Sequence, residues 1–248
     1  MRRANLIVAE VLSILRNKVA PGVSTFEMDQ IAEEYCLDCG GIPAFKGYYG
    51  FPASLCVSVN EEVVHGIPSR KRILREGDIV SLDFGVLYQG FYGDAAITLP
   101  VGTISEKKAR LLQVTEEALY KGIAQALTGN RVADISQAVQ SHVENAGFSI
   151  VRQYVGHGVG AQLHEAPEVP NYRSAGKSSP RLLEGMVIAI EPMVNMGTHQ
   201  VKTLDDHWTV VTEDRQPSAH FEHSVAITAT GPYILSHKET AGDELVSC

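Results

Sequence analysis

The chain has 248 residues, a net charge of −8, 44% hydrophobic residues and 20% charged residues. These are the proportions of an ordinary globular protein, and the acidic balance argues against a nucleic-acid-binding protein, which usually carries a basic excess. No window approaches the roughly 18 uninterrupted apolar residues of a membrane-spanning helix, and charged residues interrupt the apolar residues near the start, so no signal peptide is predicted. We therefore expect a cytoplasmic protein without a membrane partner.

Two helices are predicted at the start of the chain. Apolar residues recur at helical spacing through residues 4–18. Ser24-Thr25-Phe26-Glu27 offers a capping box for a second helix, which Gly40-Gly41 ends. A loop rich in aromatic and turn residues follows from Pro43 to Pro52, and then a short strand from Leu55 to Val59.

The next two predicted strands each carry an aspartate in an apolar context. Asp83 follows Ile79–Leu82, and Asp94 lies eleven residues further along, after Phe91-Tyr92. Buried strands rarely keep a carboxylate unless something compensates its charge, and a metal ion or a buried cation is the usual compensation. Taken singly, an aspartate at a strand end is more often a cap or a turn former than a ligand.

The pattern of the first hundred residues then starts again. The segment from Gly22 aligns with the segment from Gly129 at an offset of 107, and EGDIVSLDF aligns with EGMVIAIEP at an offset of 108. Two separated segments that keep nearly one offset indicate a duplication. The second alignment places Asp83 and Glu191 at matching positions, so that both halves would present a carboxylate to one shared central site.

We therefore predict an α/β (α+β) protein made of two helix–helix–strand halves related by a pseudo-two-fold axis. The halves would cover approximately residues 1–104 and 105–235 of a single domain that spans 1–248. Helices are predicted at 105–127 and 129–147, and the polar tail is 236–248.

Four carboxylates and one imidazole lie in apolar or glycine-flanked segments. They are Asp83, Asp94, His157, Glu191 and Glu222. Four carboxylates cannot share a small site as anions without cations, because like charges raise one another's pKa. Two divalent ions would remove the conflict, and an oxygen-rich set with one nitrogen suits Mn, Fe, Co or Zn.

Two further histidines and an aromatic loop point to a substrate site. His65 and His164 each stand three residues before a proline, in HGIP and HEAP, and histidines near a metal can hydrogen-bond a substrate carbonyl. Aromatic residues of such loops more often pack the loop itself, yet beside a site they can also line an apolar pocket; those of the loop are Phe45, Tyr48, Tyr49 and Phe51.

The motifs HGIP, GHGVG, LHEAP, IEPM and FEHS surround these residues, and with them the chain closely resembles the methionine aminopeptidases of the bacterial, type I class. The resemblance runs from the first helix to about residue 235. It implies the pita-bread fold, in which two pseudo-two-fold halves surround a central antiparallel sheet. The duplication described above agrees with that fold.

The resemblance also implies a role for each of the five charged positions. Asp83 would chelate one divalent ion through both oxygens, and Asp94 and Glu222 would bridge the two ions. His157 and Glu191 would bind the other ion, and Glu191 would also shuttle the proton of the bridging water. A metal-bridging hydroxide would then attack the first peptide bond, with the oxyanion stabilised by the ions and a histidine.

The substrate contacts are implied in the same way. His65 and His164 would contact the substrate near the scissile peptide. The residues that would enclose the methionine side chain are Tyr48, Phe51, Cys56 and Trp208, with Phe45 and Leu163 at wall positions where a common bacterial pattern has Cys and Phe. The implied substrates are the N-termini of nascent polypeptides near the ribosome, with a small second residue preferred, and we expect a monomer that binds no nucleic acid directly.

Two rival interpretations remain open from the sequence. A Pro-directed aminopeptidase or prolidase shares the pita-bread fold, but usually carries a separate N-terminal domain and another ligand pattern. A catalytically inactive binding module of the same fold would have lost metal ligands, whereas all five positions are kept here.

Overall fold

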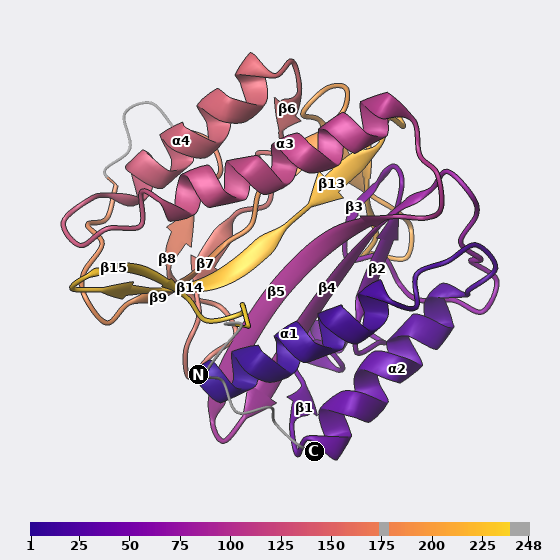
Figure 1. The fold of residues 1–248 in the computed structure, drawn as a ribbon, viewed down its shortest axis with the longest axis horizontal. Coiled ribbons are helices and arrows are strands. Elements are labelled where there is room, and N and C mark those ends of the chain that lie inside the picture. Colours follow the sequence, from indigo (N-terminus) through magenta and orange to yellow (C-terminus); the bar gives the residue numbers. More distant parts are fainter. Residues whose placement is uncertain (174–178, 239–248) are drawn as a thin grey trace.

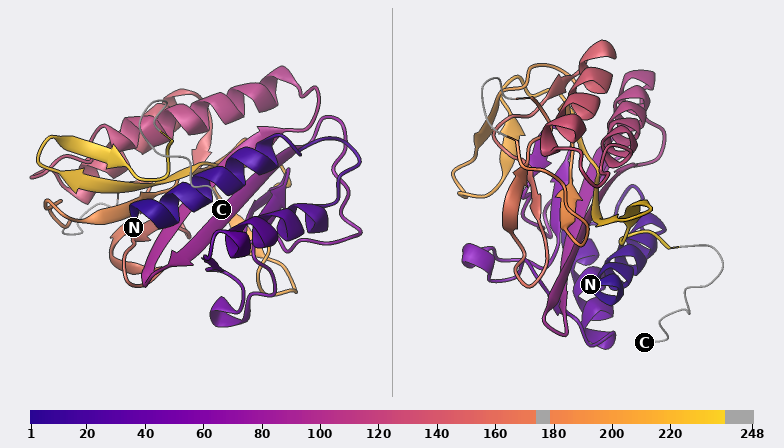
Figure 2. Two further views of the ribbon diagram at one scale, coloured as in Figure 1. Left: turned by 60° about the horizontal axis from the view of Figure 1, so that its bottom comes forward. Right: turned by 90° about the vertical axis from the view of Figure 1, so that its left-hand side faces the viewer.

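Among the described residues, a curved sheet of nine strands forms the centre, and four α-helices cover one of its faces (Figures 1 and 2). The computed structural model describes residues 1–173 and 179–238, so the part of the predicted tail from 239 to 248 lies outside the described residues. The helices are α1 (Arg2–Arg16), α2 (Thr25–Asp38), α3 (Glu106–Ile123) and α4 (Val132–Asn145).

The large sheet has the order β1-β4-β5-β14-β9-β7-β8, with β2 paired to β4 and β15 paired to β14, and these pairings are antiparallel. Two three-stranded sheets, β13-β10-β6 and β11-β12-β3, lie beside it. The first strands and the short 3₁₀ helix η1 are β1 (Ile42–Pro43), η1 (Tyr48–Gly50), β2 (Cys56–Val59), β3 (Glu62–Val64), β4 (Ile79–Tyr88) and β5 (Phe91–Pro100). The later strands are β6 (Ser149–Ile150), β7 (Gly156–Gly158), β8 (Glu165–Val169), β9 (Val187–Ile190), β10 (Met193–Asn195), β11 (Val201–Thr203), β12 (Val210–Thr212), β13 (Ser218–His220), β14 (Glu222–Thr228) and β15 (Gly231–Ile234).

The predicted helices form within a few residues of their expected limits. Ser24 caps α2 as the sequence indicates: its hydroxyl accepts a hydrogen bond from the Glu27 backbone N–H at 3.2 Å, and its own N–H donates to Glu27 Oε2 at 2.9 Å. Helix α3 begins in a similar way at Ser105, whose hydroxyl accepts from the Lys108 N–H at 3.4 Å.

The duplication is visible in the backbone hydrogen bonds. In the first half the Gly22 N–H donates to the Leu74 carbonyl at 2.8 Å, and in the second half the Gly129 N–H donates to the Leu182 carbonyl at 2.9 Å. Each bond ties the turn before the second helix of its half to the segment that leads into a central strand. The donors are 107 residues apart and the acceptors 108, which are the offsets of the sequence repeat, so the predicted duplication extends to single hydrogen bonds.

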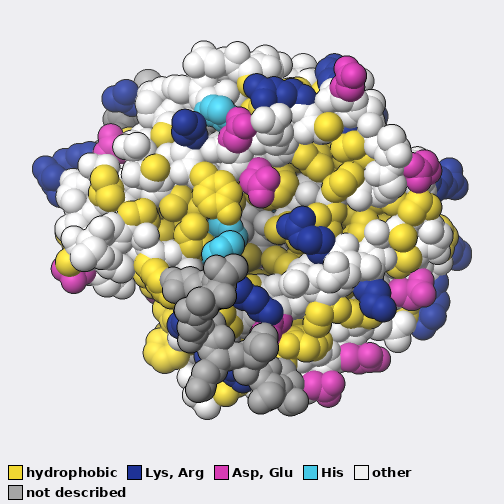
Figure 3. All heavy atoms as spheres, in the orientation of Figure 1, with side chains coloured by type: hydrophobic (Ala, Val, Ile, Leu, Met, Phe, Trp, Pro, Cys, Tyr) yellow, Lys and Arg dark blue, Asp and Glu magenta, His cyan; other side chains and the backbone are white. Residues whose placement is uncertain are grey.

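Each helix pair has its own apolar core against the sheet. One core joins α1 and α2 to β2, β4 and β5, and the other joins α3 and α4 to β9 and β14. The outer surface of the helices carries Lys, Arg, Asp and Glu side chains dispersed among apolar ones (Figure 3). Burial of the inner helix faces is therefore what fixes both pairs on one side of the sheet.

Helix α1 begins unusually close to strand β5. A Cβ atom at Gly93 would lie 2.7 Å from the Asn5 backbone nitrogen, closer than real Cβ contacts allow. Only glycine therefore permits this approach. Because Asp94 is the next residue, the close packing of α1 behind the strand fixes the backbone that carries its carboxylate toward the opposite face.

Candidate active site

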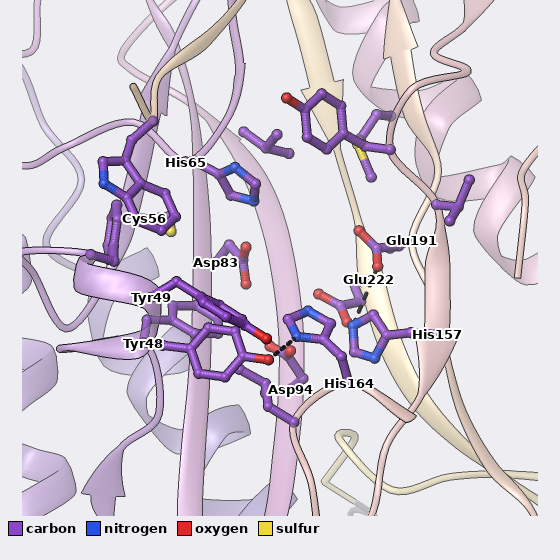
Figure 4. Close-up of a pocket in the computed structure, with 18 residues that line it drawn as sticks. Tyr48, Tyr49, Cys56, His65, Asp83, Asp94, His157, His164, Glu191 and Glu222 are labelled. Carbon is purple, nitrogen blue, oxygen red and sulfur yellow. Dashed lines mark hydrogen bonds and ion pairs between the residues drawn. The ribbon is translucent and has the colours of Figure 1, made fainter. Parts of the chain in front are cut away.

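Three of the predicted acidic residues share one face of three adjacent strands. Asp83 on β4 pairs across the strands with Ala96 on β5, and Ala96 also pairs with Glu222 on β14. Residues two apart on a strand face the same way, so Asp94 joins this row from β5. Glu191 follows the last residue of β9 and points toward the same point (Figure 4).

These carboxylates are short of partners. Asp94 and Glu222 are 3% and 2% exposed. Among the described residues, one oxygen each of Asp83, Asp94 and Glu222 is buried without a hydrogen-bond partner. Leaving buried carboxylate oxygens unpaired costs several kcal/mol. A cation bound between them would offset this cost.

Burial, and then the neighbouring carboxylates, change the acidity of this cluster. Loss of hydration raises the pKa of Asp83 and of Glu191 to about 7, and raises the pKa values of Asp94 and Glu222 well above the ordinary range. For Asp94 the Asp83 charge adds to the effect of burial, and for Glu222 the Asp94 charge does so. In the metal-free protein Asp83 and Glu191 therefore exchange their protons near neutral pH, and Asp94 and Glu222 keep theirs to higher pH than ordinary carboxyl groups do.

Histidine 157 stands beside the acidic row. Its Nδ1 lies 2.9 Å from the Gly158 carbonyl, and its Nε2 lies 3.6 Å from Glu191 Oε1. With Nδ1 as the donor to the carbonyl, Nε2 carries the free lone pair. Ligand atoms of Asp94, His157 and Glu222 all lie within 4.8 Å of one another, a spacing and donor set that fit a divalent ion.

His65 and His164 both line the cavity that holds the row. The ring of His164 lies 4.2 Å from that of His157, centroid to centroid, and its Nδ1 is 2.8 Å from the Tyr48 hydroxyl, which leaves Nε2 free. Burial, with a smaller contribution from His220, lowers the pKa of His65 to about 4. His65 also has a left-handed φ of 58°, a conformation that is uncommon outside glycine.

A cavity of about 300 Å³ opens directly above the acidic row (Figure 4). One end of it is apolar: Phe51 and Cys56 are buried in a cluster to which Phe45 and Trp208 contribute. Phe51 and Trp208 pack edge to face at 5.1 Å between centroids. All residues predicted for the site line this cavity, namely Phe45, Tyr48, Phe51, Cys56, His65, Asp83, Asp94, His157, Leu163, His164, Glu191, Trp208 and Glu222.

Other lining residues escaped the sequence analysis. Those outside the aromatic loop are Val64, Tyr154, Val155 and Met193. Each lies within three residues of a predicted site residue, which was the available signal. Tyr49 of the loop stands at the rim, where it is 87% exposed.

His220 was also missed. It is buried beneath the cavity, its Nε2 is 3.6 Å from Glu191 Oε2, and neither ring nitrogen has a hydrogen-bond partner among the described residues. Glu191 therefore lies between two imidazoles, those of His157 and His220.

Comparison with known proteins identifies the class. Residues 1–229 match the model of metallopeptidase family M24, and the chain belongs to this family. It is 56% identical over 236 residues to methionine aminopeptidase 1 of Bacillus subtilis, and 52% identical over 236 residues to a methionine aminopeptidase of Clostridium acetobutylicum. In both cases 95% of this chain and 94% of the relative are covered.

Solved structures agree with these relatives. The crystal structure of a methionine aminopeptidase from Thermotoga maritima matches with a TM-score of 0.93 and 45% identity, covering 96% of this chain and 95% of that one. A prolidase from Pyrococcus horikoshii matches with a TM-score of 0.76 but 24% identity, and only 61% of it is covered. The likeness to the prolidase shows a shared fold alone. Among the described residues, no helix is long and apolar enough to cross a membrane.

Proposed function

We propose that this protein is a metal-dependent aminopeptidase that removes the N-terminal methionine from polypeptides. The observation that carries the proposal is a single cavity that joins a row of buried, unpaired carboxylates to an apolar end of aromatic and thiol side chains. The relatives at 52–56% identity, which are named methionine aminopeptidases, support the same activity.

In this proposal two divalent ions bind to the acidic row and to His157 beside it. Asp83, Asp94, His157, Glu191 and Glu222 would hold them, in agreement with the unpaired oxygens and with the free Nε2 of His157. When bound, such ions activate water and polarise the scissile carbonyl. The family implies the use of divalent metal, and Co, Mn, Fe and Zn are all compatible with this donor set.

The remaining steps belong to side chains of the chain itself. Glu191 accepts the proton released from water and delivers it to the leaving amine. The C–O bond to the water oxygen replaces the C–N bond of the peptide, and the products are free methionine and the shortened peptide. His164 Nε2, held by the Tyr48 hydroxyl at Nδ1, donates to the oxygen that gains charge. His65 stays neutral because its pKa is about 4, and it positions the peptide near the bond that breaks.

The apolar end of the cavity selects the first side chain. Phe45, Phe51, Cys56, Leu163 and Trp208 present no charge, so an unbranched thioether side chain is favoured there. We place the substrates among nascent polypeptides in the cytoplasm near the ribosome, with a small second residue preferred, and we expect the enzyme to act as a monomer.

The test is cleavage of Met-Ala-Ser by protein that has been freed of metal by a chelator and then loaded with single metals. Release of methionine that is absent in the chelated protein and returns with a divalent ion is the expected result. Hydrolysis of Xaa-Pro dipeptides without release of methionine would instead assign the chain to the prolidase type of activity.

A further inference from the structure

One wall of the cavity is a phenylalanine ring lying on a glycine. A Cβ atom at Gly85 of strand β4 would lie 2.7 Å from Cε1 of Phe45 and 3.2 Å from its Cζ. The first distance is shorter than real Cβ contacts. The ring of Phe45 therefore occupies the place that any side chain at position 85 would need.

The glycine faces the cavity and not the core. Gly85 is two residues beyond Asp83 on the same strand, so both face the same side, while Phe84 between them is buried in the core under the helices. Across the ladder Gly85 pairs directly with Asp94. Side chains of such a pair are close neighbours, so the Phe45 ring covers the flank of the acidic row.

Neighbouring contacts hold the ring against the strand. The Ala44 N–H donates to the Gly85 carbonyl at 2.9 Å, and the Tyr48 N–H donates to the Phe45 carbonyl at 2.9 Å. Lys46 Nζ bonds to Glu33 of α2 at 2.6 Å. Ala44 itself would be 3.1 Å from the added Cβ. The backbone next to the ring is thus hydrogen-bonded to β4, and the following side chain is paired with α2. Since Phe45 lines the cavity, the open side toward which the ring can move is the cavity.

We propose that Gly85 and Phe45 form a complementary pair that sets the size of the apolar end of the cavity, here called the recess. The size of the recess then determines which first residue of the substrate is accepted. The proposal deepens the function proposed above and rests on it. A side chain at position 85 displaces the ring into the recess and narrows it, whereas loss of the ring widens it. The missing side chain of Gly85 is in this sense part of the specificity pocket.

The experiment is a double-mutant cycle of Gly85→Ala and Phe45→Ala in metal-loaded protein. Gly85→Ala alone should raise KM for Met-Ala-Ser about tenfold, with a smaller effect on kcat. Phe45→Ala alone should shift the ratio of kcat/KM between Met-Ala-Ser and Phe-Ala-Ser at least tenfold toward the larger side chain. In the Phe45→Ala background the added methyl group should raise KM much less, because the ring is gone and only the 3.1 Å approach to Ala44 remains.

Gly122→Ala is the matched control. Its added Cβ would lie 2.8 Å from Val139 in the core between α3 and α4, so it creates a similar overlap away from the cavity. It should lower thermal stability and leave KM and the substrate ratio unchanged.

Binding of free L-methionine and L-phenylalanine can be measured by calorimetry and needs no turnover. It is measured on the four proteins of the cycle: the unaltered protein, the two single variants and the double variant. A Gly85→Ala effect of equal size with and without Phe45 would overturn the pair, and so would an absence of methionine binding to the unaltered protein. The unaltered protein could bind methionine, and the two substitutions could show the expected coupling in binding, without any release of methionine from Met-Ala-Ser. That result would contradict the proposed activity and support the role of the Gly85–Phe45 pair in binding.

Discussion

The two halves of the molecule have the same backbone frame but contribute different side chains to the cavity. Each half has a helix pair and a backbone bond, from Gly22 or from Gly129, that ties the frame together. The first half adds the aromatic loop, His65 and two aspartates, whereas the second half adds two other histidines, two glutamates and Trp208. The frame needs only hydrogen bonds and apolar contacts, and these repeat. Among the site residues the sequence repeat matches only Asp83 with Glu191, because a site that distinguishes attacking and leaving groups needs unlike residues.

This difference predicts that equivalent chemical changes have unlike effects in the site and in the frame. The largest effect on activity is expected for Asp94→Ala, which removes a proposed metal ligand. It should lower kcat for Met-Ala-Ser by about 10³-fold, because several kcal/mol of charge stabilisation depend on the metal site. Calorimetric titration with Mn²⁺ should show that a binding site is lost.

The matched control in the frame is Asp134→Ala. This carboxylate accepts a hydrogen bond from the Arg131 N–H at the start of α4 and lies outside the cavity. It should cost stability and leave kcat unchanged. Wild-type turnover by Asp94→Ala would contradict the metal assignment.

The next largest effect is expected for His164→Ala. Loss of a donor to the developing oxyanion should lower kcat by about 10²-fold, while the affinity for metal stays the same. Tyr48→Phe removes only the hydroxyl that holds Nδ1, so its effect on kcat should have the same direction and a smaller size. Loss of bound metal in His164→Ala would make this histidine a ligand instead.

A smaller effect concerns the pH dependence of the metal-free protein. Because the pKa values of Asp83 and Glu191 are raised to about 7, the folded state binds protons that the unfolded chain, with ordinary carboxyl pKa values near 4, has released. Stability should therefore fall as the pH rises through 7. We expect Tm to be about 5 °C higher at pH 5.5 than at pH 8, and divalent metal to reverse the trend. A metal-free protein that is more stable at pH 8 would contradict this.

The smallest predicted effect compares helix starts in the two halves. Ser24→Ala removes two hydrogen bonds of the Ser24 hydroxyl at the start of α2: the one it accepts from the Glu27 N–H and the one it donates to the Glu27 carboxylate. This should lower the free energy of unfolding by about 1 kcal/mol. Ser105→Ala removes one longer bond at 3.4 Å, and about half that loss is expected. Urea unfolding monitored by circular dichroism would rank the two, and the reverse order would show that bond length does not govern these caps.

Much of this fold was predictable because it is local or repeated. Helical spacing and the Ser24 capping box placed the helices, and the offset of 107 to 108 residues indicated the two halves. The order of the strands was not predictable from local pattern. Strand β14 inserts between β5 and β9, and such pairing between distant segments leaves no mark on the spacing of apolar residues.

The candidate site was predictable where its chemistry contradicts its surroundings. Carboxylates such as Asp83 and Glu222 stand out in apolar strands, because burial there needs compensation. Tyr154 and Met193 carry no such contradiction, since an apolar side chain facing a cavity reads like one facing the core. His220 gives no such signal in the sequence either, because it matters only through its contact with Glu191, which lies at the end of another strand.

The seam between the halves runs through the acidic row. Asp94 belongs to the first half and Glu222 to the second, and Ser224 joins the same strands by accepting from the Asp94 N–H and donating to its carbonyl. An ion held by both carboxylates would act as a removable cross-link between the halves. Metal concentration and global folding then become linked quantities: an ion at 100 times its dissociation constant adds about 2.7 kcal/mol to the stability of the entire chain.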